Sequence, residues 1–176
     1  MIDGGVKYLS VMGTMHEIGY YEGCVDENTP TNPLSMYGIA KNALRQSSLL
    51  LAEKSNTALM WLRAYYILGD DSNNNSIFSK ITQMEHEGKA SFPFVSGKNK
   101  YDFINVDELA KQIAIASTQS EVTGIINCCS GKPVSLADKV NEFIEKNHFS
   151  IVQTMENSQN VLDDSPAIWG TIPRSI

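Results

Sequence analysis

The feature that most constrains the fold is a regular alternation of short apolar segments with longer segments of helical pattern. The predicted strands, rich in β-branched and aromatic residues, are residues 6–11, 57–69, 90–95, 101–105 and 123–129. The predicted helices are residues 36–54, 77–86, 107–118 and 135–148. Ser35 and Ser135 are the expected N-caps of two of them, and Asn105 or Asp107 caps a third. Strands that alternate with helices predict an α/β fold with a largely parallel sheet.

The composition excludes two classes of partner. The chain has 176 residues, of which 42% are hydrophobic, enough for one domain with a real core. Its net charge of −6 argues against a basic face that follows nucleic-acid phosphates. No apolar run approaches the roughly 20 residues that span a bilayer. We therefore expect neither nucleic acid nor membrane as a partner.

The three cysteines, Cys24, Cys128 and Cys129, do not suggest a metal site or a disulfide framework. Two of them are adjacent, and no Cys-x-x-Cys or Cys/His spacing is present. Unpaired thiols indicate a reducing compartment, so we expect a cytoplasmic protein. We interpret Cys128 and Cys129 as buried core thiols and not as nucleophiles.

The segment "NPLSMYGIAK" places Tyr37 and Lys41 four residues apart near the start of a predicted helix. Residues at this spacing lie on one helical face. A neighbouring ammonium favours the phenolate form of a tyrosine, which can exchange a proton with an alcohol or carbonyl oxygen. A chance pair on a surface helix is the alternative interpretation.

Four other segments stand in a fixed order around this pair. Thr14 lies in the glycine-flanked loop "MGTMHEIG", and "RAYYILG", "DFINV" and "NCCSG" follow the pair. In this order and at these separations, the chain resembles the extended short-chain dehydrogenase/reductase family. This is the group of NAD(P)-dependent epimerases and dehydratases that act on nucleotide sugars. The resemblance runs from residue 6 to about residue 144.

The resemblance implies a fold and an activity. The fold would be a partial Rossmann-like parallel sheet, its second half, with a small C-terminal substrate-binding α/β portion. Residues 1–70 would carry the catalytic residues, and residues 71–176 would be mainly substrate-binding with some returning sheet elements. The activity would be hydride transfer between NAD or NADP and a nucleotide-diphosphate sugar.

The resemblance also implies residue roles. Tyr37 would be the acid/base, Lys41 would support it and hold the nicotinamide ribose, and Thr14 would bind the reacting oxygen. The expected cofactor-binding residues are Ser10, Tyr37, Lys41, Tyr66 and Ile67. The expected substrate-binding residues are Thr14, Met15, His16, Glu17, Phe94 and Tyr101. No metal is expected.

Two departures from the family pattern matter. The chain has no G-x-x-G-x-x-G turn, so we expect it to bind NAD(P) weakly or not at all by itself. Pairing with a chain that supplies the missing half would then complete the enzyme. The resemblance also implies a homodimer, in which the helix carrying Tyr37 and Lys41 packs against its mate through Leu44, Leu50 and Leu51. A catalytically inactive fragment that needs a partner chain is the alternative.

The second departure concerns the reaction. Dehydratases of the family carry Asp-Glu after the catalytic Thr, whereas Met15 and His16 stand here. This favours a 4-keto-6-deoxy-sugar reductase or synthase, with an epimerase as the alternative. His16 and Glu17 form either a catalytic pair or a loop residue beside a packed carboxylate. Tyr101 stands at the position where the family often has an arginine that binds the diphosphate of the nucleotide sugar.

Overall fold

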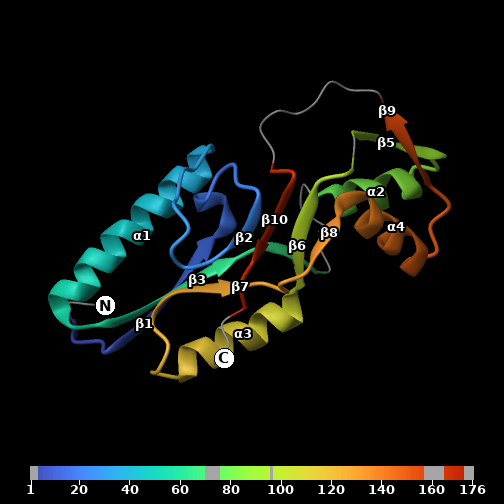
Figure 1. Cartoon of the computed structure of the whole chain (residues 1–176). Coiled ribbons are helices and arrows are strands. Elements are labelled where there is room, and N and C mark those ends of the chain that lie inside the picture. Colours follow the sequence, from blue (N-terminus) through green and yellow to red (C-terminus); the bar gives the residue numbers. More distant parts are fainter. Residues whose placement is uncertain (1–3, 70–75, 96, 157–164, 173–176) are drawn as a thin grey trace.

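The chain folds into two α/β lobes joined by a mixed sheet, as the computed structural model in Figure 1 shows. The structure describes residues 4–69, 76–95, 97–156 and 165–172, without the side chains of residues 94, 95, 155 and 156. The helices are α1 (Met36–Ser55), α2 (Ile77–His86), α3 (Val106–Thr118), α4 (Leu136–Lys146) and the 3-10 turn η2 (Met15–Glu17). The strands are β1 (Tyr8–Thr14), β2 (Gly23–Val25), β3 (Ala58–Ala64), β4 (Tyr66–Leu68), β5 (Ser91–Val95), β6 (Lys100–Asn105), β7 (Gly124–Cys128), β8 (Pro133–Ser135), β9 (Val152–Glu156) and β10 (Ala167–Gly170).

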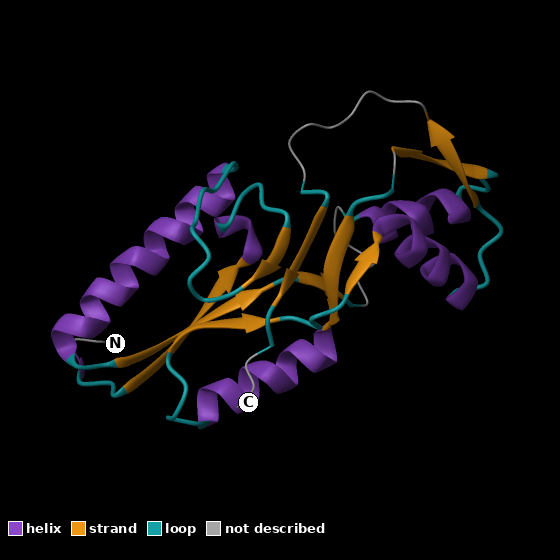
Figure 2. Cartoon of the chain, viewed as in Figure 1, coloured by secondary structure: helices purple, strands orange, loops and turns teal. Residues whose placement is uncertain are grey.

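The predicted α/β fold class is confirmed. The first sheet has the order β1-β3-β7 with parallel pairs only, and Figure 2 shows helices on both of its sides. A second sheet has the order β2-β10-β6-β4, and β8 joins it as an antiparallel neighbour of β6. Strands β5 and β9 pair in parallel over α2 and α4 in the smaller lobe. No described helix is long and apolar enough to cross a membrane.

Most of the predicted helix boundaries hold, and the N-caps explain why. The side chains of Ser35, Ser76, Asn105 and Ser135 each accept a backbone N–H from the first turn of the helix that follows. Asn105, and not Asp107, caps α3. The left-handed conformation of Asn56 ends α1.

The prediction of one continuous strand over residues 57–69 is wrong. The strand breaks at Tyr65, so that β3 belongs to the first sheet and β4 to the second. The Tyr65 N–H still donates to the Cys128 carbonyl, and Tyr66 then pairs with Phe103 of β6. The apolar pattern continues from the buried β3 into β4, although Ile67 of β4 is exposed, and it therefore hides the change of sheet.

The two faces of the first sheet differ in chemistry. Met60, Leu62 and Ala64 alternate along β3 and pack with Leu109 and Ala116 of α3 in an apolar core. The intervening residues of β3 include Trp61 and Arg63, which alternate to the opposite face and meet Glu17 there, together with Arg45 of α1. Helix α1 covers that face (Figure 1). That second face is therefore built around polar groups.

Helix α1 has its apolar face turned away from the sheet. Its buried residues are Gly38, Ser48 and Ala52. The exposed residues of the helix include five large apolar side chains on one face, which we call the apolar stripe: Met36, Ile39, Leu44, Leu50 and Leu51. The apolar pattern in the sequence predicted the helix, but it did not identify the side that faces the sheet.

Asp102 ties the two sheets together. Its fully buried carboxylate accepts the N–H and Oγ–H of Ser130, at 2.7 and 2.6 Å. It also accepts the N–H groups of Gly131 and Gly170, at 2.9 and 3.1 Å. One side chain of β6 thus fixes both the turn after β7 and the last residue of β10.

Replacing Asp102 by Asn tests this junction. The amide introduced by Asp102→Asn would turn a donor toward backbone N–H groups that need an acceptor, so we expect a loss of about 3 kcal/mol in the free energy of unfolding. Urea denaturation followed by circular dichroism measures it. The exposed Glu121, replaced by Gln, is the control and should stay within about 0.5 kcal/mol of the parent. Equal stability of the two variants would contradict the proposed junction.

Candidate active site

The turn at the carboxyl end of β1 is held by reciprocal hydrogen bonds. Thr14 Oγ1 accepts the His16 N–H at 3.3 Å, and Glu17 Oε1 accepts the Thr14 N–H at 2.8 Å. This capping box fixes the backbone of Thr14 and the direction of its hydroxyl group. It also sends consecutive side chains in opposite directions: His16 is exposed and Glu17 is fully buried.

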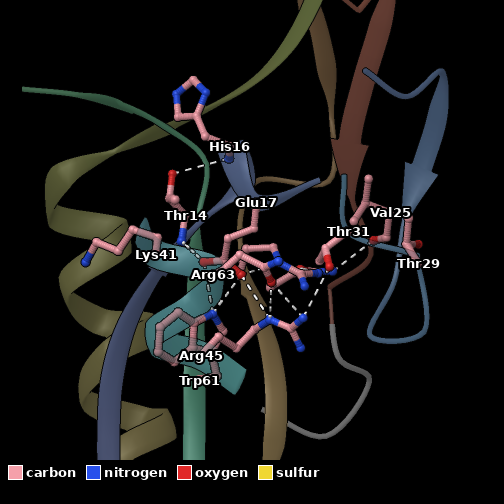
Figure 3. A network of polar contacts seen from close by, with 12 residues as sticks. Thr14, His16, Glu17, Val25, Thr29, Thr31, Lys41, Arg45, Trp61 and Arg63 are labelled. Carbon is pink, nitrogen blue, oxygen red and sulfur yellow. Dashed lines mark hydrogen bonds and ion pairs between the residues drawn. The ribbon is translucent and has the colours of Figure 1, made fainter. Parts of the chain in front are cut away.

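Glu17 is the centre of a buried polar cluster, shown in Figure 3. Trp61 Nε1 donates to its two carboxylate oxygens at 3.1 and 3.0 Å. The Nε atoms of Arg45 and Arg63 lie 3.5 and 3.9 Å from Oε2. The predicted substrate contact of Glu17 is not supported by this position, because the carboxylate is enclosed by protein groups. The sequence allowed two interpretations of His16 and Glu17. The structure fits the one in which His16 is a loop residue and Glu17 a buried, hydrogen-bonded carboxylate.

Arg63 completes this cluster from the middle of β3. Burial lowers the pKa of its guanidinium, while the carboxylate of Glu17 opposes this shift. Nη1 donates to the Asp26 carbonyl at 3.2 Å and to Asn127 Oδ1 at 3.3 Å. A buried arginine inside an apolar strand needs such partners, and the Asp26 carbonyl, Asn127 and Glu17 supply them.

Two glycines allow the close contacts on which the site depends. A Cβ atom on Gly13 would lie 2.1 Å from Trp61 Nε1, so only glycine lets the indole pass β1 to reach Glu17. A Cβ atom on Gly38 would lie 2.4 Å from the His16 carbonyl oxygen. Because Gly38 directly follows Tyr37, its missing side chain brings the start of α1 against η2.

Tyr37 and Lys41 lie beside this turn. Lys41 Nζ donates to the Met12 carbonyl at 2.9 Å, which fixes the ammonium at the end of β1. The Tyr37 side chain is 53% exposed, and its ring meets the His16 ring edge-on with centroids 5.9 Å apart. The structure thus brings together the three predicted catalytic residues Thr14, Tyr37 and Lys41.

These residues line a cavity of about 360 Å³ at the carboxyl ends of β1 and β3. Its walls are Met12, Gly13, Thr14, Met15, His16, Tyr37, Lys41, Ala64, Tyr65, Tyr66 and Ile67. A second cavity of about 220 Å³ is lined by Met15, His16, Gly19, Leu34, Ser35, Tyr66 and Ser165. We call them the catalytic cavity and the side cavity. Crevices at the carboxyl ends of parallel strands are where α/β proteins bind their ligands.

The remaining predicted site residues divide into three groups. Tyr66 and Ile67 line the catalytic cavity as expected for cofactor contact, and His16 and Met15 line both cavities. Ser10 and Tyr101 line neither. Tyr101 is buried and packs against the Tyr66 ring, with centroids 4.6 Å apart. The side chain of Phe94 lies outside the described residues.

The sequence analysis missed four residues of the side cavity: Gly19, Leu34, Ser35 and Ser165. Ser35 was identified only as a helix cap. Ser165 comes from the far end of the chain, where its Oγ accepts the Tyr21 N–H at 3.1 Å. No local pattern marks such a residue, because it is positioned by β10 inserting between β2 and β6.

The buried thiols are poor nucleophiles. Burial raises the pKa of Cys128 to about 11 and raises that of Cys129 further, and the nearby Asp102 adds to the latter shift. Cys24 is exposed, with its Sγ 3.1 Å from Thr171 Oγ1.

Thiol labelling tests this assignment. At pH 8, iodoacetamide should modify Cys24 and leave Cys128 and Cys129 intact, because the two buried groups are uncharged and shielded. All three should react in guanidinium chloride. Mass spectrometry of peptides identifies the sites. Rapid labelling of Cys128 or Cys129 in the native protein would contradict the buried placement.

The comparisons with known proteins agree with this geometry. Residues 1–129 match the model of the NAD dependent epimerase/dehydratase family. The chain is 47% identical over 171 residues to a dTDP-6-deoxy-L-talose 4-dehydrogenase (NAD(+)) of Aggregatibacter actinomycetemcomitans, covering 97% of this chain and 63% of that protein.

Two solved structures are similar in fold. MoeE5 in complex with UDP-glucuronic acid and NAD has a TM-score of 0.80 at 19% identity, over 97% of this chain and 57% of its own. A UDP-N-acetylglucosamine 4-epimerase from Methanobrevibacter ruminantium has a TM-score of 0.83 at 18% identity, over 97% of this chain and 56% of its own. The chain thus spans somewhat more than half the length of these proteins. From the family match and the placement of Thr14, Tyr37 and Lys41, we conclude that the chain belongs to the NAD-dependent epimerase/dehydratase family.

Proposed function

We propose that the protein oxidises or reduces a carbon of a nucleotide-bound sugar with NAD, as a 4-keto-6-deoxy-sugar reductase or 4-dehydrogenase. The observation that carries the proposal is the convergence of Thr14, Tyr37 and Lys41 on the catalytic cavity. The 47% identity to a dTDP-6-deoxy-L-talose 4-dehydrogenase supports a dTDP-linked 6-deoxy sugar as the substrate.

The residues present fit the nicotinamide end of the cofactor. The catalytic cavity offers an ammonium at Lys41, a phenol at Tyr37 and backbone at Tyr66 and Ile67. Bound NAD would supply the hydride acceptor or donor. No glycine-rich phosphate turn occurs in the sequence, so the expectation that this chain alone binds NAD weakly stays a prediction.

The protein groups handle the proton. Thr14 Oγ1 is directed by the capping box and would hydrogen-bond the sugar oxygen that reacts. Tyr37 Oη would take the proton from that oxygen during oxidation and return it during reduction. The Lys41 ammonium, held by the Met12 carbonyl, would stabilise the phenolate.

A dehydratase is less well supported. Removing water from a sugar requires an acid and a base beside the reacting carbons. Neither cavity has an Asp or Glu among the described residues that line it, and Glu17 lies in the buried cluster. An epimerase stays a second hypothesis, since it would use the same Tyr37 and Lys41.

Two surfaces support the proposed partner chains: the apolar stripe of α1 and the outer edge of β1. The exposed apolar stripe of α1 supports a homodimer, because such a stripe loses contact with water when two copies pair. Within the described residues β1 pairs only with β3, so its other edge can accept a further strand, as a chain carrying the nucleotide-binding half would supply. The division into catalytic residues 1–70 and substrate-binding residues 71–176 remains part of this proposal, as does a cytoplasmic location.

Replacing Tyr37 by Phe tests the proton-transfer role. We expect kcat for oxidation of dTDP-6-deoxy-L-talose with NAD to fall by about 10²–10⁴-fold, because only the phenolic oxygen is lost. The rate is read from the absorbance of reduced nicotinamide, on protein purified natively so that any associated chain is retained. Tyr20, 50% exposed and lining neither cavity, replaced by Phe, is the matched control. Unchanged turnover of the Tyr37 variant would remove Tyr37 from the mechanism.

Charge on the α1 stripe tests the homodimer. Leu50 is 59% exposed and Leu51 is 53% exposed, so replacing both by Glu should leave the fold intact and repel a second copy. Light scattering should give the mass of a dimer for the parent and half that mass for the variant. Val152→Glu in β9, at 58% exposure, is the control and should leave the mass unchanged. A monomeric parent protein would refute the homodimer.

A further inference from the structure

We propose that Arg45 is a positioning residue for the reaction. Its ion pair with Glu17 holds helix α1 in register with the turn that carries Thr14, and Tyr37 and Lys41 move with that helix. Arg45 is not among the described residues that line either cavity, so it acts through these groups and not by touching the ligand. The inference rests on the proposed function, since it assumes that the phenol of α1 exchanges a proton with a sugar oxygen.

Arg45 lies on the same side of α1 as the catalytic pair. Tyr37, Lys41 and Arg45 follow one another at intervals of four residues, which places them along one helical face. Lys41 Nζ donates to the Met12 carbonyl at the end of β1. About 6 Å further along the helix axis, the Arg45 guanidinium meets Glu17 of η2. The helix is therefore held beside the catalytic cavity at two levels.

The Arg45 guanidinium joins three segments of the chain. Nε lies 3.5 Å from Glu17 Oε2 in η2. Nε and Nη2 both donate to Asn42 Oδ1 in α1, at 3.2 and 2.8 Å. Nη2 also donates to Thr31 Oγ1, at 3.3 Å, in the segment before the helix. The side chain of Arg45 is only 12% exposed, so its ion pair is screened less than one on the surface.

Polar contacts hold this part of α1 more firmly than apolar packing does. The residues of the helix that are buried are Gly38, Ser48 and Ala52, and Leu49 is partly buried. Small side chains form low ridges, which interlock weakly with a neighbouring element. Hydrogen bonds and ion pairs are directional and resist sliding. The register of the helix against η2 therefore depends on Lys41 and Arg45.

The charge of Glu17 does not depend on Arg45 alone. Arg63 Nε lies 3.9 Å from the same carboxylate oxygen, and Trp61 Nε1 donates to the carboxylate. Removal of Arg45 thus leaves Glu17 paired, unlike the loss of a partner that strands a buried charge. Arg63 and Trp61 both belong to β3, so neither can tie the carboxylate to α1. Loss of Arg45 would therefore displace the helix more than it destabilises the fold.

Replacing Arg45 by Met tests the positioning role. We expect kcat for oxidation of dTDP-6-deoxy-L-talose to fall by about 10²-fold with KM nearly unchanged, because a small misplacement of a catalytic group has such an effect. The melting temperature should fall by only about 5 °C, since Glu17 stays paired. Lys54→Met, at an exposed position in the last turn of α1, is the control and should match the parent in both measurements.

Arg45→Lys is the conservative variant. It keeps a cation that can reach Glu17 Oε2 but loses the forked hydrogen bonds to Asn42, so kcat should fall by only about tenfold. This variant carries the same test if Arg45→Met does not fold. Turnover at the parent rate in the folded variants would overturn the inference.

A double-mutant cycle shows whether Arg45 acts through Tyr37. In the Tyr37→Phe background no phenolic oxygen is left to position, so Arg45→Met should lower kcat by less than about tenfold. A merely structural role would give the same fold-change in both backgrounds. An equal loss in the two backgrounds would therefore contradict the inference.

A measurement without turnover separates this inference from the proposed function. The rings of His16 and Tyr37 meet with centroids 5.9 Å apart, so an NMR cross-relaxation peak between them reports the register of α1 against η2. This peak should lose most of its intensity in Arg45→Met, whereas the Phe78–Phe143 contact, with centroids 5.1 Å apart, should keep its own. A parent protein without turnover refutes the proposed function. An unchanged peak refutes the positioning by Arg45, whether or not the parent turns over.

Discussion

The buried carboxylate of Glu17 is the interaction on which the catalytic end of the structure depends. It receives a backbone N–H from Thr14, the indole N–H of Trp61 and the guanidinium groups of Arg45 and Arg63. These groups come from β1, β3 and α1, so one side chain fixes three elements relative to one another. A buried charge is tolerated only when it is paired and hydrogen-bonded in this way, and its partners are consequently held in single positions.

The position of this cluster explains the unusual orientation of α1. The helix faces the sheet with Gly38, Arg45 and Ser48, which fit against polar groups, and turns its leucines outward. Its first turn is also pressed against η2 through the missing side chain of Gly38. The same packing that places Tyr37 and Lys41 beside Thr14 therefore leaves an apolar stripe on the surface, and the catalytic geometry and the proposed homodimer have a common origin.

At Tyr65 the chain leaves the first sheet and enters the second, and this change of sheet forms one wall of the catalytic cavity. Because β4 leaves the first sheet and pairs with β6, Tyr66 faces His16 between the two lobes. Burial strongly raises the pKa of the Tyr65 hydroxyl, which keeps this residue a neutral part of the core. Asp102 holds the far side of the junction by binding the turn after β7 and the end of β10. The cavities are thus framed by segments that are distant in sequence.

The sequence by itself determined the α/β class, the helices with their Ser caps, and the three catalytic candidates, because hydrophobic period, capping residues and motif spacing are local properties of the chain. It left open which face of α1 meets the sheet, since an apolar stripe gives the same pattern whether it packs on a core or on a partner. It also left open the roles of His16 and Glu17, adjacent residues whose opposite burial follows from the turn at η2. Only the tertiary structure decided these points and brought Leu34 and Ser165 to one cavity: the bridge between Gly19 and Asn32 holds the segment before Leu34, and the pairing of β10 with β2 and β6 positions Ser165.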